Sequence, residues 1–194
     1  MVHRDGADGK LFVALAEIDE ISAATVRAAG CASCGGPLDR ADYNRKPRGD
    51  LGDAAGGFVR RRSFCCRREG CRQRATPPSV RFLGRKVYVA VIVVVASVLG
   101  RERPLTGRGR APRVENVPAR TVRRWLDWWT IAFALGSFWR EAKGLFASPV
   151  DDATLPGSLL ERFVGSKDAA LTMLLRLIAP VTTTSVRASI AMPV

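Results

Sequence analysis

The segment RRRSFCCRREGCRQR, residues 60–74, places three cysteines among seven arginines. Upstream, GCASCGGPL at residues 30–38 contains the pair Cys31-x2-Cys34, and the two segments hold all five cysteines of the chain. The opening MVHRDGADGK is polar and predicts no export signal, so the expected compartment is a reducing cytosol, where disulfides are rare. Closely spaced thiols in such a compartment are more often metal ligands or redox groups than disulfides. The cysteines therefore predict a local fold organised by a metal ion.

Cys31 and Cys34 form the first half of the predicted metal site. Two thiolates three positions apart bind one ion only where the backbone turns sharply, and Gly35, Gly36 and Pro37 supply such a turn. The same three residues disfavour the helix that a thioredoxin-like redox motif needs. Metal binding is therefore the favoured interpretation of this pair.

The second half of the site comes from the arginine-rich segment. Cys71 supplies one ligand, and the spacing allows either Cys65 or Cys66 as the other. Successive strand residues point to opposite faces, so these two neighbours are not expected to bind the same ion. Phe64, two residues before Cys66, favours Cys66, and four cysteines close a tetrahedral site around Zn²⁺. The predicted ligands of a Zn²⁺ cofactor are Cys31, Cys34, Cys66 and Cys71.

The charge of the chain predicts a polyanionic partner. Its 194 residues carry a formal net charge of +13, which favours nucleic acid first and an anionic membrane surface second. A metal ion would hold residues 60–74 together with little apolar core, which leaves their surface available for charge. The alternative is an arginine run that is merely solvated. The predicted phosphate contacts in this segment are Arg60, Arg61, Arg62, Arg67, Arg68, Arg72 and Arg74.

Several apolar patterns predict helices. Residues 10–28 have a helical composition with an apolar stripe along one face. The apolar run VYVAVIVVVASVL, residues 87–99, is shorter than the ~20 residues of a membrane span, so no span is expected, and a buried helix is favoured over a strand. Short helices are expected over residues 158–164 and 168–178, and the apolar face of the second closes the core or pairs with another copy of the chain.

The tryptophan-rich segment after residue 116 predicts the clearest helix. Asn116 is a candidate cap, and Pro118 is expected in the first turn. Apolar residues at steps of three and four then predict one buried face, formed by Val122, Trp125, Trp129, Ala132, Phe133, Gly136 and Trp139.

The amino end of this helix is arginine-rich, which is typical of a recognition helix that meets bases and phosphates. The alternative is a core helix with solvated arginines. The predicted nucleic-acid contacts here are Arg120, Thr121, Arg123 and Arg124.

Two stretches resemble a known group of proteins. CASCGGPLDRADYNRKPRG, followed by RRRSFCCRREGCRQRATPPSVRFLGRKVYVAVIVVVAS, resembles bacterial zinc-ribbon proteins encoded beside insertion elements and, more loosely, the amino-terminal zinc ribbons of transposases. The shared features are a C-x2-C pair, an aromatic-x-C…C knuckle, Thr-Pro, a Phe-x-Gly-Arg turn and an apolar helix. A segment similar to TVRRWLDWW follows as a helix-turn-helix element. The resemblance covers roughly residues 30–140 and implies DNA binding in a mobile element.

The predicted fold class is mainly α with a small β zinc ribbon, followed by a helix-turn-helix-like helical region. Its expected segments are an N-terminal helix (1–29), a zinc ribbon with a basic loop (30–82), a helix-turn-helix-like DNA-binding region (83–145) and a C-terminal helical tail (146–194). The expected partners are nucleic acid, with DNA favoured over RNA, and a transposase or a second copy of the chain. The expected location is the cytoplasm, on the bacterial nucleoid.

No complete catalytic set is recognised in the sequence. His3 is the single histidine, which disfavours two-histidine nicking enzymes and tyrosine recombinases. The carboxylates of the second half lack the strand-rich frame of a two-metal nuclease. The prediction is a non-enzymatic, zinc-dependent nucleic-acid-binding protein that is accessory to, regulates or derives from a bacterial transposable element. The alternatives are a protein–protein adaptor and an RNA-binding zinc-ribbon protein.

Overall fold

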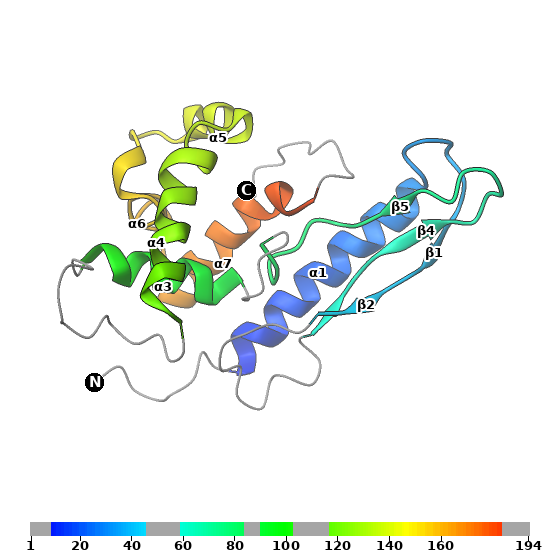
Figure 1. Ribbon diagram of the computed structural model, residues 1–194, viewed down its shortest axis with the longest axis horizontal. Helices are drawn as coiled ribbons and strands as arrows, with labels where there is room; N and C mark the ends of the chain where they lie inside the picture. The colour runs from blue at the N-terminus through cyan, green and yellow to red at the C-terminus, as the bar shows by residue number, and fades with distance from the viewer. Residues whose placement is uncertain (1–8, 46–58, 84–89, 103–116, 184–194) are drawn as a thin grey trace.

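The computed structural model describes residues 9–45, 59–83, 90–102 and 117–183. These residues form a mainly helical fold with a small antiparallel sheet, which confirms the predicted mixture of helix and strand. In Figure 1, α1 runs beside the strands at one end of the molecule, and helices α3 to α7 gather at the other. The predicted cap Asn116 and most of the basic loop within residues 30–82 lie outside the described residues. In the part of the chain that is described, no helix has the length and apolarity to cross a bilayer.

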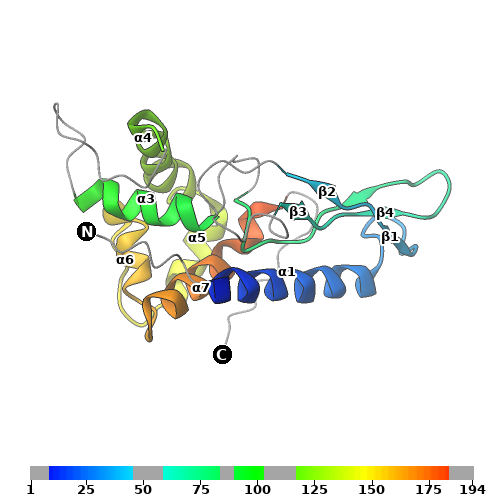
Figure 2. The ribbon, with the colours of Figure 1, turned by 90° about the horizontal axis from the view of Figure 1, so that it is seen from below.

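Helix α1, Gly9–Ala29, covers the helix predicted over residues 10–28. Its first half buries Leu11 and Leu15, and its second half buries Ala23. The helix ends at Ala29, and the next residue, Gly30, has φ +77°, a left-handed conformation that glycine adopts without strain. Figure 2 shows α1 running beneath the strands and reaching the helices at its amino end.

The strands form two small antiparallel units. Strands β1 (Leu38–Arg40), β4 (Phe64–Cys66) and β5 (Arg74–Ala75) pair in the order β1-β4-β5, and β2 (Tyr43–Asn44) pairs with β3 (Arg60–Arg61). The three-stranded unit packs against the second half of α1. The buried residues between them, named the cysteine core, are Ala23, Cys31, Leu38, Phe64 and Cys66.

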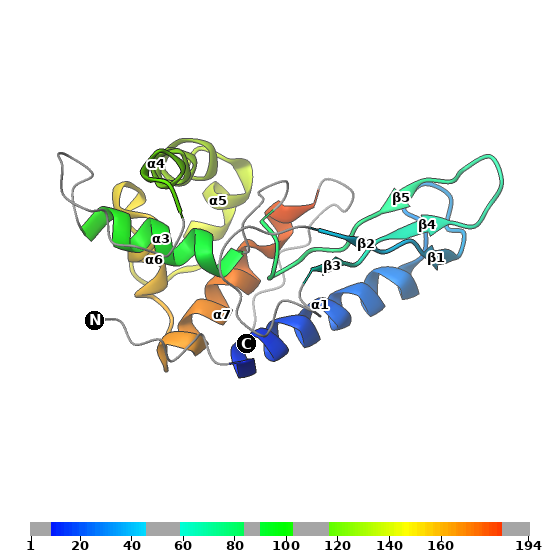
Figure 3. The same ribbon diagram turned by 60° about the horizontal axis from the view of Figure 1, so that its bottom comes forward.

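The remaining helices surround a larger apolar interior, named the helical core. It takes side chains from the first half of α1, from residues 80–83 and from every α-helix after residue 90. Figure 3 shows α7 beside the amino end of α1. The elements are α3 (Ala90–Glu102), α4 (Ala119–Asp127), the π-helix η2 (Trp128–Phe133), α5 (Ser137–Ala142), α6 (Gly157–Leu160), α7 (Lys167–Ile178), and the 3-10 helices η3 (Lys143–Leu145), η4 (Asp152–Thr154) and η5 (Ala179–Thr182).

The tryptophan-rich segment is not the single helix that its periodicity predicts. Helix α4 passes into the π-helix η2, and the chain then turns at Gly136, whose ψ of 148° is extended, before α5 begins. The π-helix changes the repeat, so Ala132, expected on the buried face, is exposed. The aromatic rings still pack together, with ring centroids 5.0 Å apart for Trp129 and Phe133 and 5.2 Å apart for Phe133 and Trp139.

Helices α3 and α4 pack against each other at Gly100. A Cβ atom added to Gly100 would lie 2.6 Å from Val122 Cγ1, closer than two carbon atoms can pack. Glycine at position 100 therefore allows the two helices to cross.

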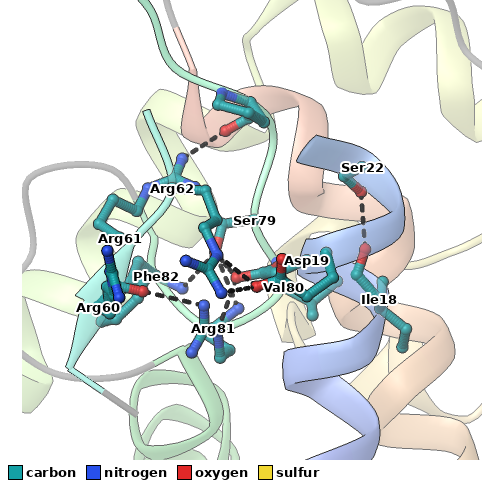
Figure 4. Close-up of polar contacts among 12 residues, drawn as sticks. Ile18, Asp19, Ser22, Arg60, Arg61, Arg62, Ser79, Val80, Arg81 and Phe82 are labelled. Carbon is teal, nitrogen blue, oxygen red and sulfur yellow. Dashed lines mark hydrogen bonds and ion pairs between the residues drawn. The ribbon is translucent and has the colours of Figure 1, made fainter. Parts of the chain in front are cut away.

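Asp19 lies in the middle of α1, between the two cores, and is almost completely buried at 1% exposure. Its Oδ2 accepts hydrogen bonds from Ser79 Oγ at 2.6 Å and from Arg81 Nε at 2.8 Å, and its Oδ1 accepts one from the Val80 amide at 2.8 Å. The Ser79 amide in turn donates to Thr182 Oγ1 at 3.0 Å. Figure 4 shows the contacts of Asp19, which link α1 to the segment that follows the sheet. The bond from Ser79 to Thr182 links the same segment to the carboxyl end of the described chain.

Candidate metal centre

Four cysteines converge at the end of the sheet that is remote from the helical core. Cys31 and Cys34 lie in the turn after α1, Cys66 ends β4, and Cys71 lies in the turn before β5. Their four Sγ atoms all lie within 4.8 Å of one another. The Sγ atoms of Cys31 and Cys71 are 3.7 Å apart, and those of Cys34 and Cys66 are 3.5 Å apart. A tetrahedral ion with bonds of about 2.3 Å to sulfur would separate its ligands by roughly 3.8 Å, so the four thiols fit one metal ion.

The first turn holds its two cysteines through its backbone. The Gly35 amide donates to the Cys31 carbonyl at 2.7 Å, and the Cys31 amide donates to the Gly36 carbonyl at 2.9 Å. Gly35 has φ +66°, which a residue with a side chain rarely adopts. A Cβ atom on Gly36 would lie 3.2 Å from Cys66 Sγ and 3.3 Å from Cys34 Sγ. The glycines predicted to make this turn thus also leave room for the sulfur atoms.

Cys65 does not belong to the cluster. It alternates with Cys66 along β4, and its Sγ lies 3.4 Å from the Arg72 carbonyl, on the other side of the strand. Cys66 is fully buried beside the other thiols, whereas Cys65 is half-buried. The structure thus brings Cys66, the residue favoured from the position of Phe64, into the cluster, and strand alternation turns Cys65 away from it.

The thiols of the cluster differ in acidity. The backbone N–H of Ser33 hydrogen-bonds to the Cys31 sulfur and lowers the pKa of Cys31 to about 6. Burial raises the pKa of Cys66 to about 12. At neutral pH without a metal ion, Cys31 is therefore a thiolate and Cys66 a thiol, so a metal ion that binds both must displace a proton.

The seven arginines predicted to contact phosphate have two different environments. Arg61 is buried, and Arg62 is enclosed by ion pairs with Glu20 and Asp42. Neither presents an open surface for the predicted contact with a polyanion, because strand alternation turns Arg61 inward and two carboxylates already engage Arg62. The other five arginines of this segment are exposed: Arg60, Arg67, Arg68, Arg72 and Arg74.

Some of the exposed arginines also brace the sheet. Arg67 binds the Asp39 carboxylate through two nitrogen atoms, with Nη2 at 2.6 Å from Oδ1 and Nε at 3.0 Å from Oδ2, and this contact lowers the pKa of Asp39. Arg68 Nη1 donates to the Cys34 carbonyl at 3.0 Å. These arginines are held in place while their outer faces stay in solvent.

The second predicted set lies on α4, away from the cysteines. Arg120, Arg123 and Arg124 are exposed there. Thr121 is 7% exposed and faces the interior, so its predicted contact with nucleic acid is wrong. Arg27 and Arg40, exposed cations beside the cysteine core, were missed, because each stands outside the arginine run.

Comparison with known proteins gives no information on function, so function is inferred from the geometry of the cysteines and arginines. No protein-family model matches the chain, and neither a curated protein nor a solved structure shows significant similarity to it.

Proposed function

We propose that the chain is a nucleic-acid-binding protein in which Cys31, Cys34, Cys66 and Cys71 hold one structural Zn²⁺. The convergence of four sulfur atoms at tetrahedral spacing carries this proposal. Four soft thiolates suit zinc, and a site closed by four protein ligands has no open position for catalysis. In this proposal the three-stranded sheet β1-β4-β5, named the cysteine sheet, is a zinc ribbon together with the two cysteine turns, as the resemblance to insertion-element proteins implied.

The exposed arginines support nucleic acid as the partner. Five of them lie in residues 60–74 and three lie on α4, and all eight are exposed to solvent. Arginine binds phosphate through its planar fork, and DNA duplex is the first substrate to test. Helices α3 and α4, which pack closely at Gly100, stand where the helix-turn-helix was expected. We assign the exposed arginine face of α4 to the groove of that duplex.

Salt dependence tests this assignment. For about six phosphate contacts, affinity for a labelled duplex is expected to fall roughly 10³-fold between 50 and 200 mM salt. The double variant Arg123→Gln/Arg124→Gln should weaken binding and reduce the slope of log affinity against log salt by about 1 for each arginine. Arg162→Gln, at a cation outside both arginine sets, is the matched control and should bind as wild type. Fluorescence anisotropy measures all three, and a salt-independent affinity would contradict the proposal.

Exposed apolar side chains beyond α4 support a second candidate function, that of a protein–protein adaptor. Ile131 is 58% exposed and Leu135 71% exposed, both just beyond α4. Such side chains suit a protein partner such as a transposase or a second copy of the chain. Binding to a protein partner that resists salt and is lost in the double variant Ile131→Asp/Leu135→Asp would identify the adaptor. Competition between structured RNA and the DNA duplex would distinguish the RNA-binding alternative.

Zinc affinity is expected to depend on pH. Because the pKa of Cys66 is raised to about 12, its proton is still bound at pH 7, and zinc must displace it. Affinity should therefore rise about tenfold per pH unit for each displaced proton. The dependence should steepen below about pH 6, where Cys31, with its pKa of about 6, also carries a proton. Competition with a chromophoric chelator at several pH values measures this, and an affinity that does not change with pH would contradict it.

A further inference from the structure

A groove lies between the second half of α1 and the strands β1 and β4. Its volume is about 590 Å³, within the range of roughly 300–1,000 Å³ that is typical of sites for small ligands. Its apolar lining is formed by Ala23, Ala24, Ala28 and Phe64. Ala23 and Phe64 belong to the buried cysteine core, whereas Ala24 and Ala28 are exposed on α1. Because alanine ends at Cβ, a flat ring can lie against this side of the helix with most of its atoms in contact.

Charged side chains also line the groove and leave it with excess positive charge. They are Glu20, Arg27 and Arg40. Glu20 is engaged by Arg62, and its contact with Arg40 is long, with 3.9 Å between Nη2 and Oε2. The side chain of Arg27 is exposed, and no hydrogen bond or ion pair joins it to another residue in the part of the chain that is described. The groove therefore combines an apolar lining with two cations that can take an anion.

The positive charge of the groove continues into the exposed arginines of residues 60–74. Arg67 binds the Asp39 carboxylate directly and lowers its pKa. The charges of Arg27 and Arg72 lower the pKa of the same carboxyl further, so the groove and the exposed arginines lie within electrostatic reach of one another. A ligand with repeated negative charges suits such a surface better than a ligand with one anionic group. A nucleic-acid strand carries a charge at every nucleotide, which favours it over an acidic peptide.

We propose that this groove binds the base of an unpaired nucleotide, while Arg27 and Arg40 contact the phosphates beside that base. The inference rests on the proposed function and names the form of nucleic acid that the protein prefers. Within a duplex both faces of a base are stacked on neighbouring bases, so an unpaired nucleotide is needed to place a base face on an apolar surface. The preferred ligand is thus a duplex with a single-stranded end, whose paired part meets the exposed arginines.

Fluorescence anisotropy with the full chain tests this inference. Two labelled duplexes differ only in a short single-stranded overhang, which carries bases in one and has the same phosphates without bases in the other. The wild type is expected to bind the overhang with bases about 5–10-fold more tightly. Ala24→Trp, which fills the groove from an exposed position, should lose this preference and still bind a blunt duplex. Thr25→Trp, at the exposed neighbouring position outside the groove lining, is the matched control and should keep the preference.

The outcomes separate this inference from the proposed function. Equal affinity of the wild type for the two overhangs would overturn the inference whether or not Ala24→Trp folds, and blunt-duplex binding would then leave the proposed function intact. A preference that persists in a folded Ala24→Trp would also overturn it. Absence of binding to all three duplexes would refute both. Binding of a glutamate-rich peptide to the wild type but not to Ala24→Trp, without any preference for bases, would assign the groove to a protein partner instead.

Discussion

Replacing Cys34 with serine is expected to abolish zinc binding and to unfold the cysteine sheet. The four sulfur atoms lie within 4.8 Å of one another, so loss of one leaves an incomplete set of three ligands. The cysteine core contains few side chains besides the thiols and cannot replace the ion by apolar burial. Structural zinc sites contribute on the order of 10 kcal/mol to the folding of small domains. The wild type should hold one Zn²⁺ per chain, and Cys34→Ser should hold essentially none.

Cys65→Ser is the matched control for this loss. It makes the same chemical change one residue from a ligand, at a thiol that points away from the cluster, and should keep its zinc. Elemental mass spectrometry measures zinc and iron, and hydrogen–deuterium exchange should report faster exchange in residues 30–45 and 59–75 of Cys34→Ser only. A wild-type chain without metal, one loaded with iron, or equal zinc loss in both variants would refute the structural zinc site.

Asp19→Ala is expected to lower the free energy of unfolding by about 3–5 kcal/mol. The substitution removes the acceptor of three hydrogen bonds and leaves the Arg81 guanidinium, whose side chain is 3% exposed, buried without its carboxylate. Urea denaturation measures this loss. The midpoint concentration should fall, while the slope of the unfolding free energy against urea concentration should stay unchanged.

Asp39→Ala serves as the matched control for Asp19→Ala. Asp39 also binds an arginine through two nitrogen atoms, but that pair is exposed to solvent, so its loss should leave the midpoint near the wild-type value. The double variant Asp19→Leu/Arg81→Met should recover part of the stability that Asp19→Ala loses, because no unpaired charge remains. Equal midpoints for the two alanine variants would show that the buried pair contributes little.

The cysteine cluster could be predicted from the sequence because it depends on residue spacing and strand alternation within short segments. The Cys31-x2-Cys34 spacing and the following glycines define one turn, and the alternation of a strand separates Cys65 from Cys66. The first helix was equally predictable, since its apolar stripe and terminal glycine are features of one continuous segment.

The errors came from contacts between distant segments. Arg61 looked like one more surface arginine, and only the pairing of β3 with β2 places it inside. Asp19 occupies the helix position one turn after Leu15 and one turn before Ala23, which indicates burial, but its partner Arg81 is 62 residues away. The tryptophan stripe predicted burial correctly for Trp129 and Trp139, yet no periodicity rule anticipates the π-helix between them.

The clustering of aromatic rings has a spectroscopic consequence. All four tryptophans lie between residues 125 and 139, in the helical part of the molecule, and none lies in the cysteine sheet. Intrinsic tryptophan emission is therefore a built-in optical probe of one half of the protein alone. If chelation disorders only the cysteine sheet, the emission maximum should stay unchanged. If the loss of structure extends along α1 into the helical core, the maximum should shift to longer wavelength.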